Sequence, residues 1–290
     1  LVGGGLYAGV DVLSFTPYAI YTPTSVVDVV RGCVPVVGIA VLAVYSYSPS
    51  NYADRTEVSG SYRMFKQYIP GTYSALVSKT LVDTHRSNGG LLSVCLVAGV
   101  LFGLVVFLIW GVQNLVDIVL NKSIIHSVLL SLTAYTTYEQ ITQYDDLEEY
   151  TYTPISVRQV FLSKYIVFLL FMLPITILFY GGGVLYYQPT ILNSFVGGVV
   201  FVSLSTYMYG VTIFNNGFGS GEFMFDTVSF GLFAIAFFIA VLPLLFASLV
   251  VNLPLLGVGS ILVWCLVLSV VGFYLIWTSP MYWKEKYLAN

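Results

Sequence analysis

The densest group of reactive side chains lies in one short stretch, where four carboxylates occupy five positions: Asp145, Asp146, Glu148 and Glu149. Carboxylates packed so closely cannot enter lipid, so the segment is expected to lie in water. Paired glutamates serve some intramembrane proteases, but that chemistry needs a membrane-buried site and a basic residue four positions on, where this chain has Thr153. We therefore expect the stretch to dock on another protein and not to catalyse a reaction.

The remaining reactive groups do not form a recognisable catalytic or metal site. A phosphate-binding loop needs a glycine directly before its Lys-Thr pair, whereas Lys79-Thr80 follows Val77-Ser78. The two histidines, His85 and His126, are predicted on opposite sides of a membrane, so they cannot hold a metal together. We expect no catalytic residue, no metal ion and no cofactor bound by this chain. Any ATP hydrolysis must come from a partner.

The composition sets the fold class. The chain has 290 residues, of which 58% are hydrophobic and only 9% are charged, whereas a soluble domain carries about 25% charged residues. Several apolar stretches exceed the roughly 20 residues that cross a bilayer as a helix, which satisfies its own backbone in lipid. The sequence thus predicts an all-α integral membrane protein. The net charge of −3, without a basic run, excludes nucleic acid as a partner.

Eight transmembrane helices are predicted, at residues 1–21, 24–48, 91–112, 123–141, 162–187, 191–214, 226–251 and 254–278. If they alternate, the polar stretches between them and the tail fall on one side: 49–90, 142–161, 215–225 and 279–290. Nine of the eleven Lys and Arg residues lie on that side, which the positive-inside rule makes cytoplasmic. We expect a multi-pass protein of the cell membrane. Asn121-Lys122-Ser123 matches a glycosylation acceptor and would face outside.

Small residues and prolines suggest how the helices are organised. Gly99 and Gly103 have the spacing of a close helix contact. A shift of 231 residues brings Pro23 onto Pro254 and Ser48-Pro49 onto Ser279-Pro280, which suggests an internal repeat of the kind found in transporters. Four parts follow: the last two helices of a preceding repeat at 1–48, a cytoplasmic connector with an amphipathic surface helix at 49–90, a six-helix transmembrane unit at 91–278 and a cytoplasmic tail at 279–290.

The acidic stretch continues into a predicted second helix. Leu147, Tyr150 and Thr151 line one side of a short helix, and Thr153 and Pro154 are a good N-cap and first residue for the helix that follows. This order of acidic residues, Leu, Thr-Pro-x-Ser and then Ser-Lys resembles the coupling region of ABC-2-type permeases, the membrane subunits of ABC exporters. The stretch 68–79, followed by Asp83-Thr84-His85-Arg86-Ser87, resembles the amphipathic helix before the first span of such a unit.

The resemblance implies a permease subunit whose ATP and Mg²⁺ are bound by a separate ABC ATP-binding subunit. The residues expected to contact that subunit are Asp146, Leu147, Glu148, Glu149, Thr153, Pro154, Ser156 and Arg158. Lys79, Arg86 and Lys164 are expected to anchor helices at the membrane interface. The chain has two acidic pairs where the family usually has one Glu-rich turn, so which carboxylate makes the contact stays open.

Two other functions remain open at this point. Asp11 lies within a predicted span, and Arg31 lies about two turns into the next one with Asp28 beside it. Ionisable groups in lipid are costly and mark transport paths, so an ion- or proton-coupled secondary transporter using Asp11 is the alternative, although Arg31 near a helix end can also extend to the interface. A membrane scaffold without transport is the third hypothesis.

Overall fold

In the computed structural model, the structure describes residues 62, 66, 73–86, 90–115, 121–142, 155–217, 227–249 and 255–288. Every regular element in these ranges is a helix. The helices are α4 (Ser74–Arg86), α5 (Gly90–Leu115), α6 (Lys122–Leu130), α7 (Thr133–Thr142), α9 (Val157–Ile175), the π-helix η3 (Thr176–Tyr180), α10 (Gly181–Tyr187), α11 (Ile191–Asn216), α12 (Thr227–Ser248) and α13 (Leu255–Leu288). The predicted all-α class is confirmed for this part of the chain.

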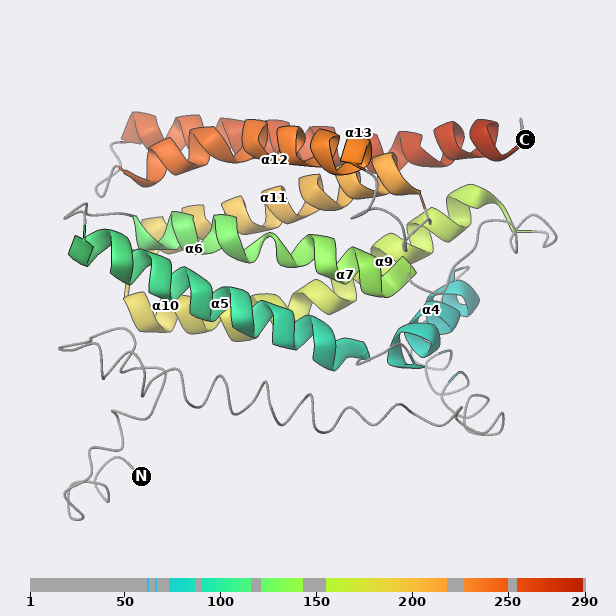
Figure 1. Ribbon diagram of the computed structural model, residues 1–290, viewed down its shortest axis with the longest axis horizontal. Coiled ribbons are helices and arrows are strands. Elements are labelled where there is room, and N and C mark those ends of the chain that lie inside the picture. Colours follow the sequence, from blue (N-terminus) through green and yellow to red (C-terminus); the bar gives the residue numbers. More distant parts are fainter. Residues whose placement is uncertain are drawn as a thin grey trace, which may run out of the picture.

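The helices after α4 form an up-and-down bundle (Figure 1). α5, the pair α6 and α7, the continuous run from α9 to α10, and then α11, α12 and α13 each cross it once. Four of these helices are long and apolar enough to span a membrane: Val157–Leu185, Ile191–Asn216, Gly231–Ser248 and Gly257–Lys284. A shorter apolar helix, Cys95–Ile109, lies within α5. The predicted count of eight is not confirmed. Its first two spans and the proposed repeat involve residues 1–48, which lie outside the described ranges.

The predicted span 123–141 is wrong as a single helix. The chain forms α6 and α7, which are separated by a turn at Ser131 and Leu132. The Ser131 hydroxyl donates to the Val128 carbonyl at 2.6 Å, and the Thr133 hydroxyl donates to the Leu130 carbonyl at 2.7 Å. Hydroxyls that bond to nearby backbone carbonyls often bend helices. A prediction based only on the length of an apolar stretch does not take such bonds into account.

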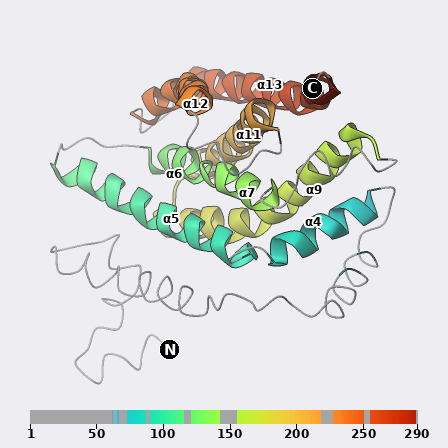
Figure 2. The same ribbon diagram turned by 45° about the vertical axis from the view of Figure 1, so that its right-hand side comes forward.

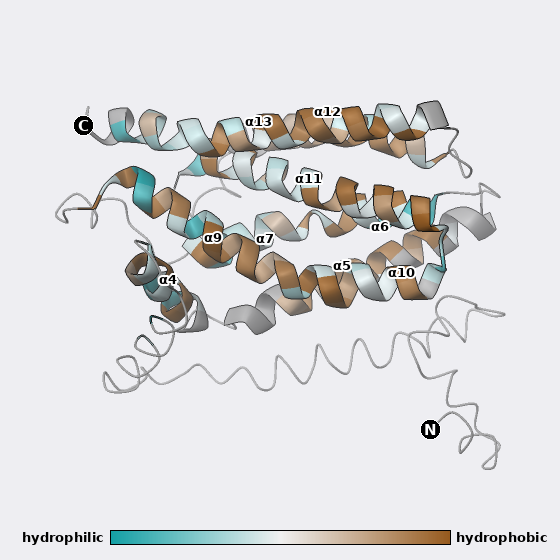
Figure 3. Ribbon diagram, turned by 180° about the vertical axis from the view of Figure 1, so that it is seen from behind, coloured by the Kyte–Doolittle hydropathy of each residue, from teal (hydrophilic) through white to brown (hydrophobic). Residues whose placement is uncertain are grey.

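α11 is the central helix of the bundle. Over its most apolar stretch 56% is buried, compared with 28% for both α12 and α13, which expose large apolar side chains such as Phe238, Phe246 and Leu266. Apolar side chains on the outside suit a lipid environment. The hydrophilic segments gather at one end of the bundle, on α4, the start of α9 and the end of α13 (Figure 3).

Glycines let α11 and α13 cross backbone to backbone. A Cβ on Gly210 would lie 2.6 Å from the Gly272 carbonyl oxygen, and a Cβ on Gly272 would lie 2.9 Å from the Thr206 carbonyl oxygen. At Gly99, where the sequence predicts a close helix contact, a Cβ would meet only Phe179 at an ordinary 3.7 Å. The tightest approach therefore joins two helices that are distant in the sequence.

α4 lies across one end of the bundle, beside the start of α9 and the end of α7 (Figures 1 and 2). The end of α11 and the end of α13 lie at this end too, because Trp283 of α13 bonds to carbonyls near the end of α11. We call this the α4 end. The helix ends that flank the predicted cytoplasmic stretches therefore lie together, while the assignment of this end to the cytoplasm stays a prediction.

At the opposite end, Asn121 is built into the fold. It is 4% exposed and caps α6, its side-chain oxygen accepting from the Ile124 N–H at 3.4 Å. Its own N–H donates to the Ser248 carbonyl of α12 at 2.6 Å. An asparagine held this way is not accessible for glycosylation, so the acceptor motif has a structural role.

Candidate functional site

The candidate site is the α4 end, because α7 ends and α9 begins there, and the acidic segment 143–154 connects these two helices in the sequence. Segment 143–154 itself, with Asp146, Leu147, Glu148, Glu149, Thr153 and Pro154, lies outside the described ranges, as do Asp11 and Arg31. The structure describes what flanks the segment. These flanking elements are the end of α7 and the start of α9, and α4 packs against both of them.

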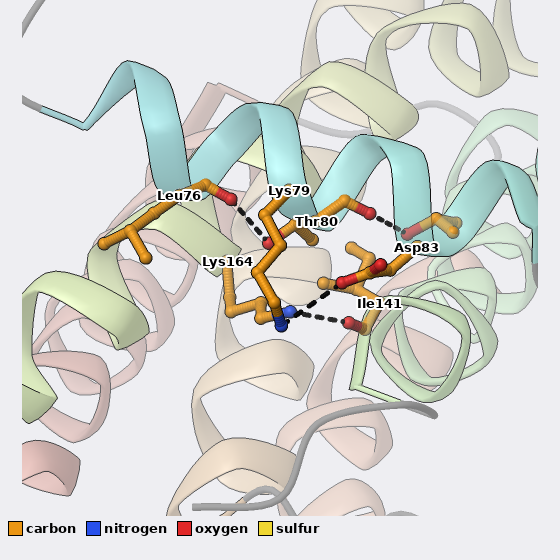
Figure 4. Close-up of polar contacts among 7 residues, drawn as sticks. Leu76, Lys79, Thr80, Asp83, Ile141 and Lys164 are labelled. Carbon is orange, nitrogen blue, oxygen red and sulfur yellow. Dashed lines mark hydrogen bonds and ion pairs between the residues drawn. The ribbon is translucent and has the colours of Figure 1, made fainter. Parts of the chain in front are cut away.

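α4 forms where the sequence predicts a surface helix. Val77, Thr80 and Thr84 are buried against the bundle, and both threonine hydroxyls donate to carbonyls one turn back, at 3.0 Å and 2.8 Å. On the outer side, Lys79 pairs with Asp83 at 3.3 Å (Figure 4). An exposed i, i+4 pair contributes only about 0.3–0.5 kcal/mol, so burial of the inner face is what holds α4 in place.

The predicted anchors differ in their positions. Lys79 is 40% exposed on the side chain and lies on the outer face of α4, as a residue at an interface would. Arg86 is the last residue of α4, but its side chain lies outside the described part of the structure. Their contact with lipid headgroups stays a prediction.

Lys164 is a buried tie between two helices and not an exposed anchor. Its side chain is 1% exposed, and Nζ donates to the Ile141 carbonyl at 3.1 Å (Figure 4). Ile141 lies one residue before the end of α7, where carbonyls have no partner within the helix. A lysine at a helix C-terminus satisfies such a carbonyl and interacts favourably with the helix dipole. Lys164 thus joins α9 to α7 at the point where segment 143–154 begins.

The helix after the acidic segment begins later than predicted. Ile155 and Ser156 are not helical, and α9 begins at Val157. The Ser156 hydroxyl accepts from the Gln159 N–H at 3.3 Å, while the Ser156 N–H donates to the Gln159 side chain at 3.0 Å. This is a capping box, whose pattern of Ser followed three residues later by Gln is visible in the sequence. The helix that enters the next span therefore starts at Val157 and not at Pro154, while Thr153 and Pro154 themselves lie outside the described ranges.

Arg158, a predicted partner contact, lies on α9 against α13. Its guanidinium carbon lies 3.7 Å from the centre of the Trp277 ring. Arg158 is exposed and Trp277 is 53% exposed, so the cation–π contact contributes about 0.5–1 kcal/mol. The first turns of α9 are thus connected to α13 through Arg158 and to α7 through Lys164.

Gly217 is a residue of this end that sequence reasoning missed. It ends α11 with φ 58°, and the ring of Trp283 lies where a Cβ would be, at 2.7 Å. The Trp283 indole N–H donates to the Ile213 and Phe214 carbonyls, both at 3.2 Å. The buried Tyr138 hydroxyl donates to the Gly217 carbonyl. The signal in the sequence was a glycine that follows a long apolar run after two asparagines, and glycine is common just after the end of a helix.

The α4 end therefore contains contacts that join α7, α9, α11 and α13 close to the two helix ends that flank the acidic segment in the sequence. Within the described ranges, no three His, Cys, Asp or Glu side chains gather in a way that could hold a metal ion. Comparisons of the chain with protein families, with curated proteins and with solved structures each found no match.

Proposed function

We propose that the protein is the membrane-spanning permease subunit of an ATP-binding cassette exporter. The observation that carries the proposal is the Lys164 tie. The segment with four carboxylates connects α7 to α9, and Lys164 joins these two helices directly beside it. A partner that binds the segment therefore pulls on both helices at once.

The contacts of α9 suggest how such a pull spreads. At its start, α9 packs on α4 and α7, and Arg158 contacts Trp277 of α13. Further along, Pro174 interrupts the hydrogen bonding of the same helix. A displacement at the α4 end would therefore move α9 together with its neighbours, and the helix would bend in its second half.

ATP and Mg²⁺ would be bound by the partner subunit. This chain would contribute the acidic segment, which recognises the partner by charge and shape, and the helices that open and close the path.

The proposal is tested by purifying the full-length protein from its native membrane in mild detergent. We expect an ATP-hydrolysing subunit to co-purify in a fixed ratio, and the complex to hydrolyse ATP. A folded, monodisperse protein without an ATPase subunit would contradict the proposal.

Replacing Lys164 with methionine should separate partner binding from coupling. Methionine fills a similar volume without a charge that must be desolvated, so the fold should survive, while the Ile141 carbonyl loses its donor. The ATPase subunit should still co-purify, because the acidic segment is unchanged. Hydrolysis stimulated by the permease should fall about fivefold or more, the lower end of typical coupling energies.

Lys284→Met is the matched control, because Lys284 is an exposed lysine near the end of α13. It should leave both binding and hydrolysis unchanged. Hydrolysis at the wild-type rate in the Lys164→Met complex would show that the tie does not transmit movement.

A further inference from the structure

One turn of the helix that runs from α9 to α10 is π-helical. It comprises Thr176–Tyr180, and the Gly181 N–H donates to the Thr176 carbonyl, five residues back. A π-turn holds an extra residue and is usually found at functional positions. Pro174, which lacks an N–H, precedes this turn, and the poor helix formers Gly181, Gly182 and Gly183 follow it. The helix is therefore intrinsically weak here.

His126 of α6 contacts this turn. Its Nε2 lies 3.2 Å from the Phe179 carbonyl oxygen, and the side chain is 1% exposed. Because a carbonyl only accepts, Nε2 carries the hydrogen and the neutral ring keeps Nδ1 as an acceptor. Nδ1 is buried and has no hydrogen-bond partner in the described part of the chain. The ring is surrounded by aromatic neighbours, with Phe102 at 5.2 Å and Tyr187 at 5.7 Å between centroids.

The Phe179 oxygen is also the acceptor that the Gly183 N–H uses in a regular α-helix. The His126 ring rests on this same glycine, since a Cβ on Gly183 would lie 2.7 Å from Nε2 and 3.0 Å from Cε1. Gly182, one residue earlier, has nothing within 4 Å of such a Cβ. His126 thus contacts the Phe179 carbonyl through Nε2, and its ring lies directly against the backbone of Gly183.

A second contact holds the turn from the other side. The Tyr180 hydroxyl donates to the Ser194 carbonyl of α11. A Cβ on Gly197 would lie 2.8 Å from that hydroxyl, so α11 also approaches closely. The π-turn is therefore held between α6 and α11, while Ile177 and Leu178 on its outer side are exposed.

We propose that Thr176–Tyr180 is a two-state hinge and that the His126 contact to Phe179 holds it in the π form. When this contact is lost, the Gly183 N–H takes the Phe179 carbonyl and the turn becomes α-helical. Removing one residue from the turn rotates α10 by about 100° relative to α9, which moves a side-chain tip on its surface by roughly 8 Å. The hinge lets α10 turn while α9 remains packed on α7.

The hinge is tested by measuring the distance between spin labels at Leu185 of α10 and Val202 of α11, which are 80% and 57% exposed. The labels are placed in the full-length chain after its three cysteines are replaced with alanine. His126→Leu removes the donor, and Gly183→Ala pushes the ring off the backbone. Both should shift the distance distribution by several ångströms or add a second population.

Two matched variants should keep the parent distribution. His126→Gln retains an N–H donor, and Gly182→Ala adds the same methyl group where it meets nothing. If His126→Leu does not fold, Gly183→Ala decides, because it keeps the histidine. Parent-like distances in Gly183→Ala, or equal shifts in Gly182→Ala and Gly183→Ala, would overturn the hinge.

Discussion

Replacing Gly272 with valine should separate α13 from α11 and cause the largest loss of stability among the substitutions considered. A Cβ at this position would lie 2.9 Å from the Thr206 carbonyl oxygen and 2.9 Å from the Tyr207 backbone nitrogen and Cα. Backbone atoms inside a helix cannot give way, so the two helices must move apart along their shared length. Overpacking of this kind costs about 3 kcal/mol, which lowers the midpoint of thermal unfolding by roughly 6–12 °C.

Gly259→Val in the same helix is the control. Nothing lies within 4 Å of a Cβ at Gly259, so this variant changes helix propensity and lipid contact by the same amount without a clash. Thermal unfolding of both variants in detergent, followed by the loss of monodisperse protein, separates the two effects. Equal midpoints would show that α11 and α13 do not cross at these glycines.

Gly217→Ala should loosen the α4 end. The backbone at Gly217 has φ 58° and ψ −122°, a conformation that costs a residue with a side chain about 1–3 kcal/mol. The new methyl group would also meet the Trp283 ring at 2.7 Å and displace its indole from two carbonyls. We expect a loss of about 2 kcal/mol or more in the free energy of unfolding.

Gly231→Ala provides the comparison, because Gly231 lies in α12 with nothing within 4 Å of its added Cβ. Its unfolding midpoint should equal that of the wild type or exceed it slightly, since alanine favours helix. If Gly217→Ala were as stable as Gly231→Ala, Gly217 would not hold Trp283 in the way described.

Much of the fold followed from apolar length alone. The four long helices α9 to α10, α11, α12 and α13 lie close to the predicted spans, because about 20 apolar residues in a row have few other stable arrangements in lipid. The break between α6 and α7 did not follow from apolar length; the Ser131 and Thr133 hydroxyls bond to backbone carbonyls at this turn. Two such side chains hardly change the mean hydropathy of a segment of about 20 residues.

The start of α9 shows a different kind of error. The sequence carries two plausible helix starts, Thr153-Pro154 and Ser156 with Gln159, and local preference did not rank them correctly. The reciprocal bonds of the Ser156 capping box satisfy two backbone N–H donors, those of Ser156 and Gln159, and this gain decided the boundary.

Contacts between residues that are distant in the sequence could not be predicted from the local sequence. Gly210 and Gly272 meet across two helices, and the π-turn at Thr176–Tyr180 depends on His126 far earlier in the chain. Lys164 was expected at the membrane interface because it stands at the head of a span. Lys164 is buried against Ile141 because the end of α7 lies beside it, and the position of α7 relative to α9 could not be predicted from the sequence.

The proposed function requires that the acidic segment bind an ATP-hydrolysing subunit. The most direct test compares, by quantitative mass spectrometry, the ATPase subunit that co-purifies from native membranes with wild-type protein and with Glu148→Lys/Glu149→Lys. Asp54→Lys/Glu57→Lys is the control, because it reverses the same number of charges in another polar stretch predicted on the same side. We predict that the subunit is lost only from Glu148→Lys/Glu149→Lys. An ATPase subunit retained by that variant, or missing from the folded wild type, would contradict the claim.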